Sequence, residues 1–142
     1  MYLWDSNILR YFGQEHPNLQ LFLKRVKPHE IALPTVVVAE ILRGRSEYAL
    51  KANQDQLPYA HKLLVKTNEL LQKFKIIVFD DKCLTALKKI KRKHKSKKRY
   101  ADMLIAATAI AGNHIVITRN EKHFNDLLPK NKIENWIDDK PR

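Results

Sequence analysis

The sequence predicts an α/β fold in which a parallel sheet is covered by helices on both faces. Short apolar runs of strand length alternate along the chain with longer segments whose apolar residues recur at roughly helical spacing. Residues 76–79 are apolar without interruption, which is typical of a parallel strand buried on both faces. A length of 142 residues, with no repeat and no linker-like segment, predicts one domain over residues 1–142.

Turn and cap residues delimit the predicted elements of the N-terminal half. Asp5 and the two polar residues after it favour a turn between a strand and a helix. Pro17 and Pro34 are well placed to begin helices, and the pair Lys27 and Pro28 closes the earlier one. The predicted elements are a strand at 1–4, a helix at 8–12, a helix from 17 to 26, a strand at 31–33 and a helix from 34 to about 44.

The C-terminal half shows the same alternation. Asp80 or Asp81 can cap a helix whose inner stripe contains Leu84, Leu87 and Ile90. A later helix of small apolar residues ends at Gly112 and Asn113, which form a good C-terminal cap. The predicted strands are at 76–79, 115–118 and 133–136. One predicted helix begins at 80 or 81, and the others cover 56–74, 100–111 and 121–128.

Composition and short motifs exclude several classes of protein. The apolar stretch at 103–111 is much shorter than the roughly 20 residues that a membrane span needs, and the N-terminus lacks the features of a signal peptide. The single cysteine, Cys83, allows no internal disulfide, so the expected location is the reducing cytoplasm, with no membrane partner. Phosphate-loop, dinucleotide, zinc-protease and serine-hydrolase motifs are absent.

Positive charge is concentrated in one short segment. The chain carries 27 Lys and Arg against 15 Asp and Glu, a net charge of +12. Nine of the basic residues lie between Lys88 and Arg99 with no acid among them, which leaves 18 against 15, or +3, for the rest. Such a local excess suits contact with a phosphate backbone. The alternative is a solvated, lysine-rich helix end and loop.

Three acidic residues are candidates for a site. Glu40 lies in a helix that is apolar nearly all round and is predicted to be buried, where a carboxylate must be paired, protonated or bound to a cation. A structural ion pair with Arg43, Arg45 or a more distant partner is the alternative. Asp102 stands in the first turn of an apolar helix and Asp5 follows a strand, so either could simply cap a helix.

The joint placement of these acids is more informative than any one of them. In a parallel α/β sheet the ligand site lies beyond the carboxyl ends of the strands, where Asp5 and Asn120 both fall. Carboxylates that converge there would repel each other unless a divalent cation lies between them, and oxygen ligands suit Mg²⁺ or Mn²⁺. An acidic metal pocket beside a basic segment predicts a nuclease that acts on a polyanion.

The chain resembles the PIN-domain proteins, in particular the VapC-type toxins. The segments that carry this resemblance are residues 2–9, 37–44, 101–109, 117–120 with Phe124, and 133–136, in the family's order. The resemblance implies a three-layer α/β/α domain with a central parallel sheet and a Mg²⁺- or Mn²⁺-dependent endoribonuclease that leaves 5′-phosphate and 3′-hydroxyl ends. It also implies a homodimer that a cognate VapB-type antitoxin neutralises.

The resemblance also assigns roles to individual residues. Asp5, Glu40 and Asp102 match the family acids that hold the metal, and Asn120 falls where the family has a fourth acid or an asparagine. Ser6 and Thr118 would support the metal ligands, and His123 stands where the family often has an aspartate. The residues expected to bind the RNA substrate are Lys91, Arg92, Lys93, Lys95, Lys97, Lys98, Arg99 and Arg119.

Two other functions remain open from the residues. A non-catalytic RNA- or DNA-binding module with a PIN-like fold would use the basic segment alone, with structural acids, and its binding would survive chelation of metal. A phosphohydrolase acting on small phosphates would not need the basic segment and should hydrolyse nitrophenyl phosphate. Asp5, Ser6 and Asn7 lack the second acid expected of a phosphatase of the Asp-x-Asp type.

Overall fold

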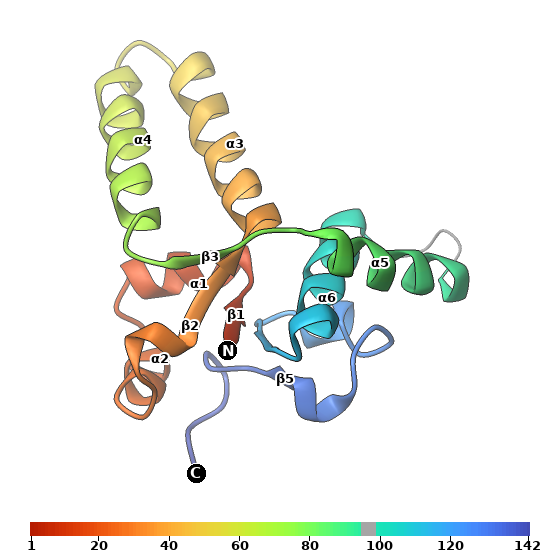
Figure 1. The fold of residues 1–142 in the computed structure, drawn as a ribbon. Helices are drawn as coiled ribbons and strands as arrows, with labels where there is room; N and C mark the ends of the chain where they lie inside the picture. Colours follow the sequence, from red (N-terminus) through yellow and green to blue (C-terminus); the bar gives the residue numbers. More distant parts are fainter. Residues whose placement is uncertain (95–98) are drawn as a thin grey trace.

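The structure, a computed structural model, describes residues 1–94 and 99–142. Within these ranges a five-stranded sheet has the order β3-β2-β1-β4-β5, and every neighbouring pair is parallel (Figure 1). The predicted parallel α/β fold is therefore confirmed. The strands are β1 (Tyr2–Trp4), β2 (Ile31–Pro34), β3 (Lys75–Ile77), β4 (Ile115–Ile117) and β5 (Ile133–Glu134).

Helices connect the strands and complete a three-layer α/β arrangement. In Figure 1, α3 and α4 form a hairpin that projects away from the sheet, whereas α5 and α6 lie together on the other side of the view. The α-helices are α1 (Ser6–Gly13), α2 (Pro17–Leu23), α3 (Thr35–Lys51), α4 (Leu57–Leu71), α5 (Asp81–Lys93) and α6 (Tyr100–Gly112). Short 3-10 helices are η1 (Pro28–Glu30), η2 (Glu121–His123) and η3 (Lys130–Lys132).

The predicted caps explain where several helices begin and end. Asp80 caps α5, because its Oδ1 accepts a hydrogen bond from the backbone N–H of Cys83 at 3.0 Å. Asn113 ends α6 in the left-handed conformation, with φ of 54°, which asparagine tolerates better than most residues. α2 ends at Leu23, earlier than predicted, and Pro28 begins η1.

Aromatic side chains form the centre of the core. Trp4, on the central strand β1, is fully buried, and its ring lies 5.6 Å from Phe12, 5.4 Å from Phe74 and 6.3 Å from Trp136 between centroids. These residues come from both ends of the chain and from the segment after α4. Their packing holds β1 in a fixed position and, with it, the residue that follows the strand, Asp5.

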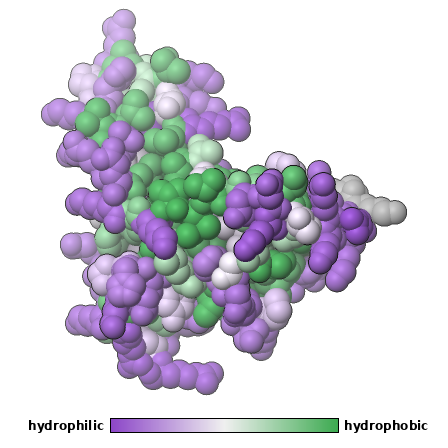
Figure 2. Space-filling view, viewed as in Figure 1, coloured by the Kyte–Doolittle hydropathy of each residue, from purple (hydrophilic) through white to green (hydrophobic). Residues whose placement is uncertain are grey.

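Three sequence predictions about local structure are wrong. Residues 76–79 are not a buried strand, because β3 is at the sheet edge and Val78, just after it, is 65% exposed. Figure 2 shows apolar surface in the middle of this face, below the α3–α4 hairpin. Residues 121–128 form only the short η2 and turns, in which tertiary contacts bury Phe124, Leu127 and Leu128 without a continuous helix. In α5, Leu84 is 41% exposed, and Cys83 is buried instead.

α3 also differs from its prediction, both in length and in burial. The helix continues past Gly44 to Lys51, because packing against α4 outweighs the cost of a glycine in a helix interior, about 1 kcal/mol. One contact between the two helices is a hydrogen bond from Arg45 Nε to Thr67 Oγ1 at 3.2 Å. Only Val37 and Ala49 of this helix are buried, so the predicted burial around Glu40 is wrong.

Candidate functional site

Asp5 is held rigidly at the carboxyl end of β1. Its Oδ1 accepts a hydrogen bond from the backbone N–H of Ser6 at 2.7 Å and so caps α1, and its Oδ2 accepts one from Thr118 Oγ1 at 2.9 Å. Thr118 is fully buried at the end of β4 and also accepts a hydrogen bond from the backbone N–H of Asn120 at 3.0 Å. The carboxylate is therefore both a helix cap and a fixed group that is 95% buried.

Asp102 lies in the first turn of α6 and is also almost completely buried, with 4% of its surface exposed. Burial raises the pKa of its carboxyl above the ordinary value, and Asp5 adds to the rise, whereas Arg99 and His123 oppose it. His123 Nδ1 lies 3.2 Å from Asp102 Oδ2. His123, which stands where the family often has an aspartate, thus faces Asp102.

Glu40 is the least buried of the three acids, with 31% of its side chain exposed. Its predicted partners are engaged elsewhere: Arg43 pairs with Glu47 at 3.1 Å, and Arg45 contacts α4. The partner is Arg99, whose Nη2 lies 3.8 Å from Glu40 Oε2. Burial raises the pKa of the Glu40 carboxyl, and the charges of Asp5 and Asp102 raise it further against the opposing effect of Arg99.

The three acids face one cleft of about 270 Å³, although they come from β1, α3 and α6. Sequence reasoning did not identify Arg10 as part of this cleft. The signal was present, because Arg10 lies four residues after Ser6 and so shares a face of α1 with it. The residues that line the cleft are Asp5, Ser6, Asn7, Arg10, Glu40, Arg99, Asp102 and Asn120.

The donor atoms in the cleft fit a hard divalent cation. Carboxylates and an asparagine carbonyl are oxygen ligands of the kind that Mg²⁺ and Mn²⁺ prefer, and mutual repulsion contributes to the raised pKa values of Glu40 and Asp102. Among residues 1–94 and 99–142, no group of three or more His, Cys, Asp or Glu side chains is placed to hold a metal ion. The cleft thus contains oxygen donors of the right kind for a metal ion, but the acidic side chains do not already form its coordination shell.

The basic residues predicted to bind RNA fall into three groups. Lys91, Arg92 and Lys93 are exposed at the end of α5, and Arg99 lines the acidic cleft. Arg119 lies elsewhere: its guanidinium pairs with both carboxylate oxygens of Asp138, at 3.2 Å each, and donates to Tyr11 Oη. The remaining three, Lys95, Lys97 and Lys98, lie outside the described residues.

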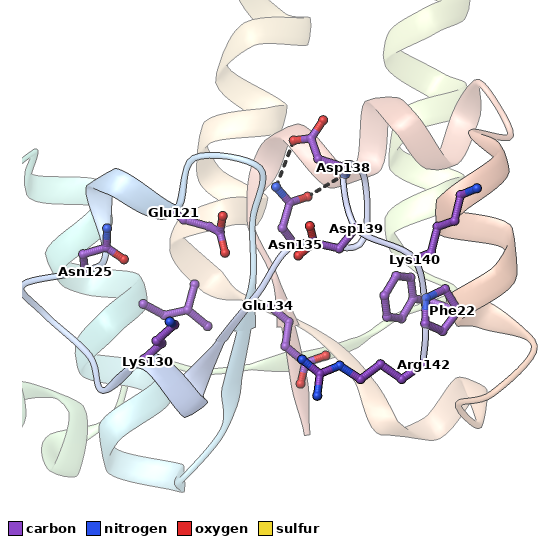
Figure 3. A pocket seen from close by; sticks show the side chains of 12 residues that line it. Phe22, Glu121, Asn125, Lys130, Glu134, Asn135, Asp138, Asp139, Lys140 and Arg142 are labelled. Atoms are coloured by element: carbon purple, nitrogen blue, oxygen red, sulfur yellow. Dashed lines mark hydrogen bonds between the residues drawn. The ribbon is translucent and has the colours of Figure 1, made fainter.

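A second and wider hollow, of about 1290 Å³, lies near the C-terminus and contains none of the predicted site residues (Figure 3). Its polar side chains bond to one another: Asn135 Nδ2 donates to Asp138 Oδ2 at 2.9 Å, and Asn135 Oδ1 accepts from the backbone of Asp138. Glu121 and Glu134 on its wall are not accompanied by the buried acids that distinguish the cleft at Asp5. The buried acids therefore make the smaller cleft, at Asp5, the better candidate for the functional site.

The raised pKa of Asp102 leads to a prediction about stability. Because the folded protein binds a proton at Asp102 more tightly than the unfolded chain does, stability falls as pH rises from the ordinary value of 3.8 through the raised pKa. Asparagine carries no charge. Asp102→Asn is therefore expected to raise Tm at pH 7 in EDTA, with a difference that disappears as the pH falls below 3.8.

Thermal unfolding followed by circular dichroism at pH 7 and at pH 3.5 measures this effect. Asp55→Asn is the matched control, because Asp55 is an exposed carboxylate in the turn between α3 and α4. An Asp102→Asn protein that melts below wild type at pH 7 would show that its contacts with Arg99 and His123 outweigh the cost of its burial.

Comparison with known proteins shows the family to which this chain belongs. The sequence profile described as the PIN domain matches residues 2–127. The chain is also 31% identical to Ribonuclease VapC2 of Rickettsia felis, over 96% of this chain and 98% of that protein. The chain belongs to the PIN-domain family, as its five sequence segments predicted.

Solved structures agree with this assignment. The structure of VapBC2 from Rickettsia felis bound to a DNA fragment from its promoter matches with a TM-score of 0.68 and 28% identity, over 95% of this chain and 98% of that chain. The DNA-bound VapBC of Salmonella typhimurium matches with a TM-score of 0.74 at 14% identity, over 95% and 97% of the two chains, and supports the fold alone. The three-layer arrangement expected from the resemblance is confirmed.

Proposed function

We propose that this protein is an endoribonuclease that hydrolyses RNA phosphodiester bonds with Mg²⁺ or Mn²⁺, and that it acts as the toxin of a VapBC-type toxin-antitoxin pair. The observation that carries the proposal is the cleft itself. Asp5, Glu40 and Asp102 reach it from three separate elements, and Arg10 and Arg99 stand on its wall. Acids that would hold a cation and arginines that would hold phosphate thus occupy one site.

Each side chain in the cleft has a role that its surroundings support. Asp5 and Asp102 would hold the metal, with Glu40 as a further ligand directly or through water, and Asn120 would help place the metal or water. Thr118 and the Ser6 backbone N–H fix the orientation of Asp5. When bound, the metal activates water and neutralises charge that develops on the phosphodiester.

The arginines would orient the substrate. Arg99 is 60% exposed and lies 3.8 Å from Glu40, so its guanidinium can reach a phosphate bound at the cleft. Arg10 reaches the cleft from α1. Two guanidinium groups on the cleft wall would hold the RNA backbone beside the acids. The acids could not do this themselves, because carboxylates do not attract phosphate.

The relatives support one class of partner. A Rickettsia felis relative at 31% identity is called Ribonuclease VapC2, and a matching structure contains a VapBC2 complex on promoter DNA. These names support a VapB-type antitoxin as partner. We further propose that the toxin is a homodimer and acts in the cytoplasm. No helix in the described part of the chain combines the length and apolar character of a bilayer span.

The deciding experiment is cleavage of a mixed RNA pool by the purified protein with Mg²⁺ or Mn²⁺, and again in excess EDTA. Cleavage is expected only with metal, and re-addition of Mn²⁺ after EDTA should restore it, because the oxygen donors of the cleft suit these ions. The Asp5→Asn, Asp102→Asn double variant is expected to be inactive under all conditions.

Two outcomes would contradict the proposal. Cleavage that is equal in EDTA and in the double variant would show that these acids are not the active site. RNA binding without cleavage, unaffected by EDTA, would instead favour the non-catalytic nucleic-acid-binding module. Hydrolysis of nitrophenyl phosphate, measured in parallel, would favour the phosphohydrolase.

A further inference from the structure

Tyr100 is an aromatic residue that the core does not use. It is the first residue of α6 and is 55% exposed, whereas core rings such as Trp4, Phe124 and Trp136 are at most 1% exposed. Tyr100 is exposed although Asp102, Met103 and Ile105, which follow it in α6, are buried. The ring therefore contributes little to the hydrophobic core.

A lysine from the basic end of α5 lies against the ring. Lys91 Nζ, from the last turn of α5, lies 5.2 Å from the centroid of the Tyr100 ring, within the range of a cation–π contact. Arg92 and Lys93, also exposed, follow Lys91 at the end of α5. Hydrophilic side chains cover much of this end of the molecule in Figure 2. An exposed ring among cations is the composition that single-stranded nucleic-acid sites share.

The residue just before Tyr100 belongs to the acidic cleft. Arg99, the residue just before Tyr100, lines that cleft and pairs with Glu40. Because Tyr100 directly follows Arg99, the Cα atoms of the two residues are about 3.8 Å apart. An RNA strand with a phosphate at Arg99 would therefore bring a neighbouring base within reach of Tyr100.

We propose that Tyr100 stacks on an unpaired base of the bound RNA, with Lys91 on an adjoining phosphate. This inference rests on the proposed ribonuclease function. A base inside a duplex has both faces covered by its neighbours, whereas an unpaired base is free to stack on an aromatic side chain. Tyr100 is thus a specificity-determining residue and Lys91 an electrostatic contact.

Tyr59 provides a matched control. It is 61% exposed, slightly more than Tyr100, and lies in the first turn of α4, where the α3–α4 hairpin turns. Its ring faces Tyr48 at 6.4 Å and is not on the cleft lining. A loss of RNA affinity caused merely by removal of an exposed tyrosine would appear at both positions.

The test is fluorescence anisotropy with a labelled 12-nucleotide single-stranded RNA in EDTA, so that binding is measured without cleavage. Tyr100→Leu is expected to weaken binding roughly tenfold, as stacking on one base is worth about 1–3 kcal/mol, whereas Tyr100→Phe and Tyr59→Leu should bind like wild type. Lys91→Gln should reduce the slope of log affinity against log salt by about 0.7, whereas Tyr100→Leu should leave that slope unchanged.

Two further probes separate stacking from a structural effect. With an RNA of the same length that carries abasic sites, and with a fully paired duplex, Tyr100→Leu should bind like wild type. Equal losses on the abasic and normal RNA, or no loss on either, would overturn the proposal. Failure of the wild-type protein to bind any RNA would instead count against the ribonuclease function, so the two failures can be told apart.

Discussion

Replacing Asp102 with asparagine is expected to reduce RNA cleavage by about a thousandfold or more. The buried carboxylate faces the cleft, and the several kcal/mol that a bound metal contributes to the transition state depend on its charged ligands. Each 1.36 kcal/mol corresponds to about a factor of ten in rate. Initial rates of cleavage of a labelled RNA, with saturating Mn²⁺, measure the effect.

The same variant carries its own folding control. Asp102→Asn is expected to be more stable than wild type at pH 7 in EDTA, and its measured Tm shows whether a loss of activity reflects unfolding. Asp55→Asn, an exposed acid outside the cleft, should cleave at the wild-type rate. Retention of more than about a tenth of the wild-type rate by Asp102→Asn would remove Asp102 from the active site.

Replacing Trp136 with alanine is expected to lower the free energy of unfolding by about 3–5 kcal/mol. Trp136 is 1% exposed and stacks on Phe22 at 5.1 Å with an interplanar angle of 7°. Its ring also lies 5.0 Å from Tyr2, and its Nε1 donates a hydrogen bond to Glu134 Oε1 at 2.9 Å. Truncation would leave a cavity between β1, β5 and α2.

Urea unfolding at equilibrium measures this loss. Trp136→Phe should lose less, because it keeps an aromatic ring in the cavity and gives up only the hydrogen bond and part of the contact area. Tyr59→Ala, at an exposed site, should change stability by no more than about 0.5 kcal/mol. A loss below about 1 kcal/mol for Trp136→Ala would show that the C-terminal segment is not part of the cooperative core.

Local chemistry made the order of the elements predictable. Asp5 and Asp80 cap the helices that follow them, and Asn113 ends α6, because capping depends on a side chain and the backbone a few residues away. Each acid could be assigned to a strand end or to a helix for the same reason, because its neighbours in sequence define that element. Asp5 at a strand end and Asp102 in a first helical turn were predicted from the residues, and both face the cleft.

Contacts between distant residues were not predictable in this way. Arg99 is the partner of Glu40 although Arg43 and Arg45 lie closer in sequence, because α3 and α6 pack with the start of α6 beside Glu40. Arg119 bonds to Asp138 and not to the cleft for a similar reason. A local pattern cannot show which of several arginines lies within reach of a given carboxylate.

Periodicity and capping act over a few residues, so the residues alone predict the parallel α/β class, the succession of strands and helices, the principal caps and the acids at strand and helix ends. Packing between distant segments places β3 at an exposed edge, keeps residues 121–128 from forming a helix, and brings Arg10 and Arg99 to the acids. These features depend on which segments pack together, and burial and pairing arise only from that packing.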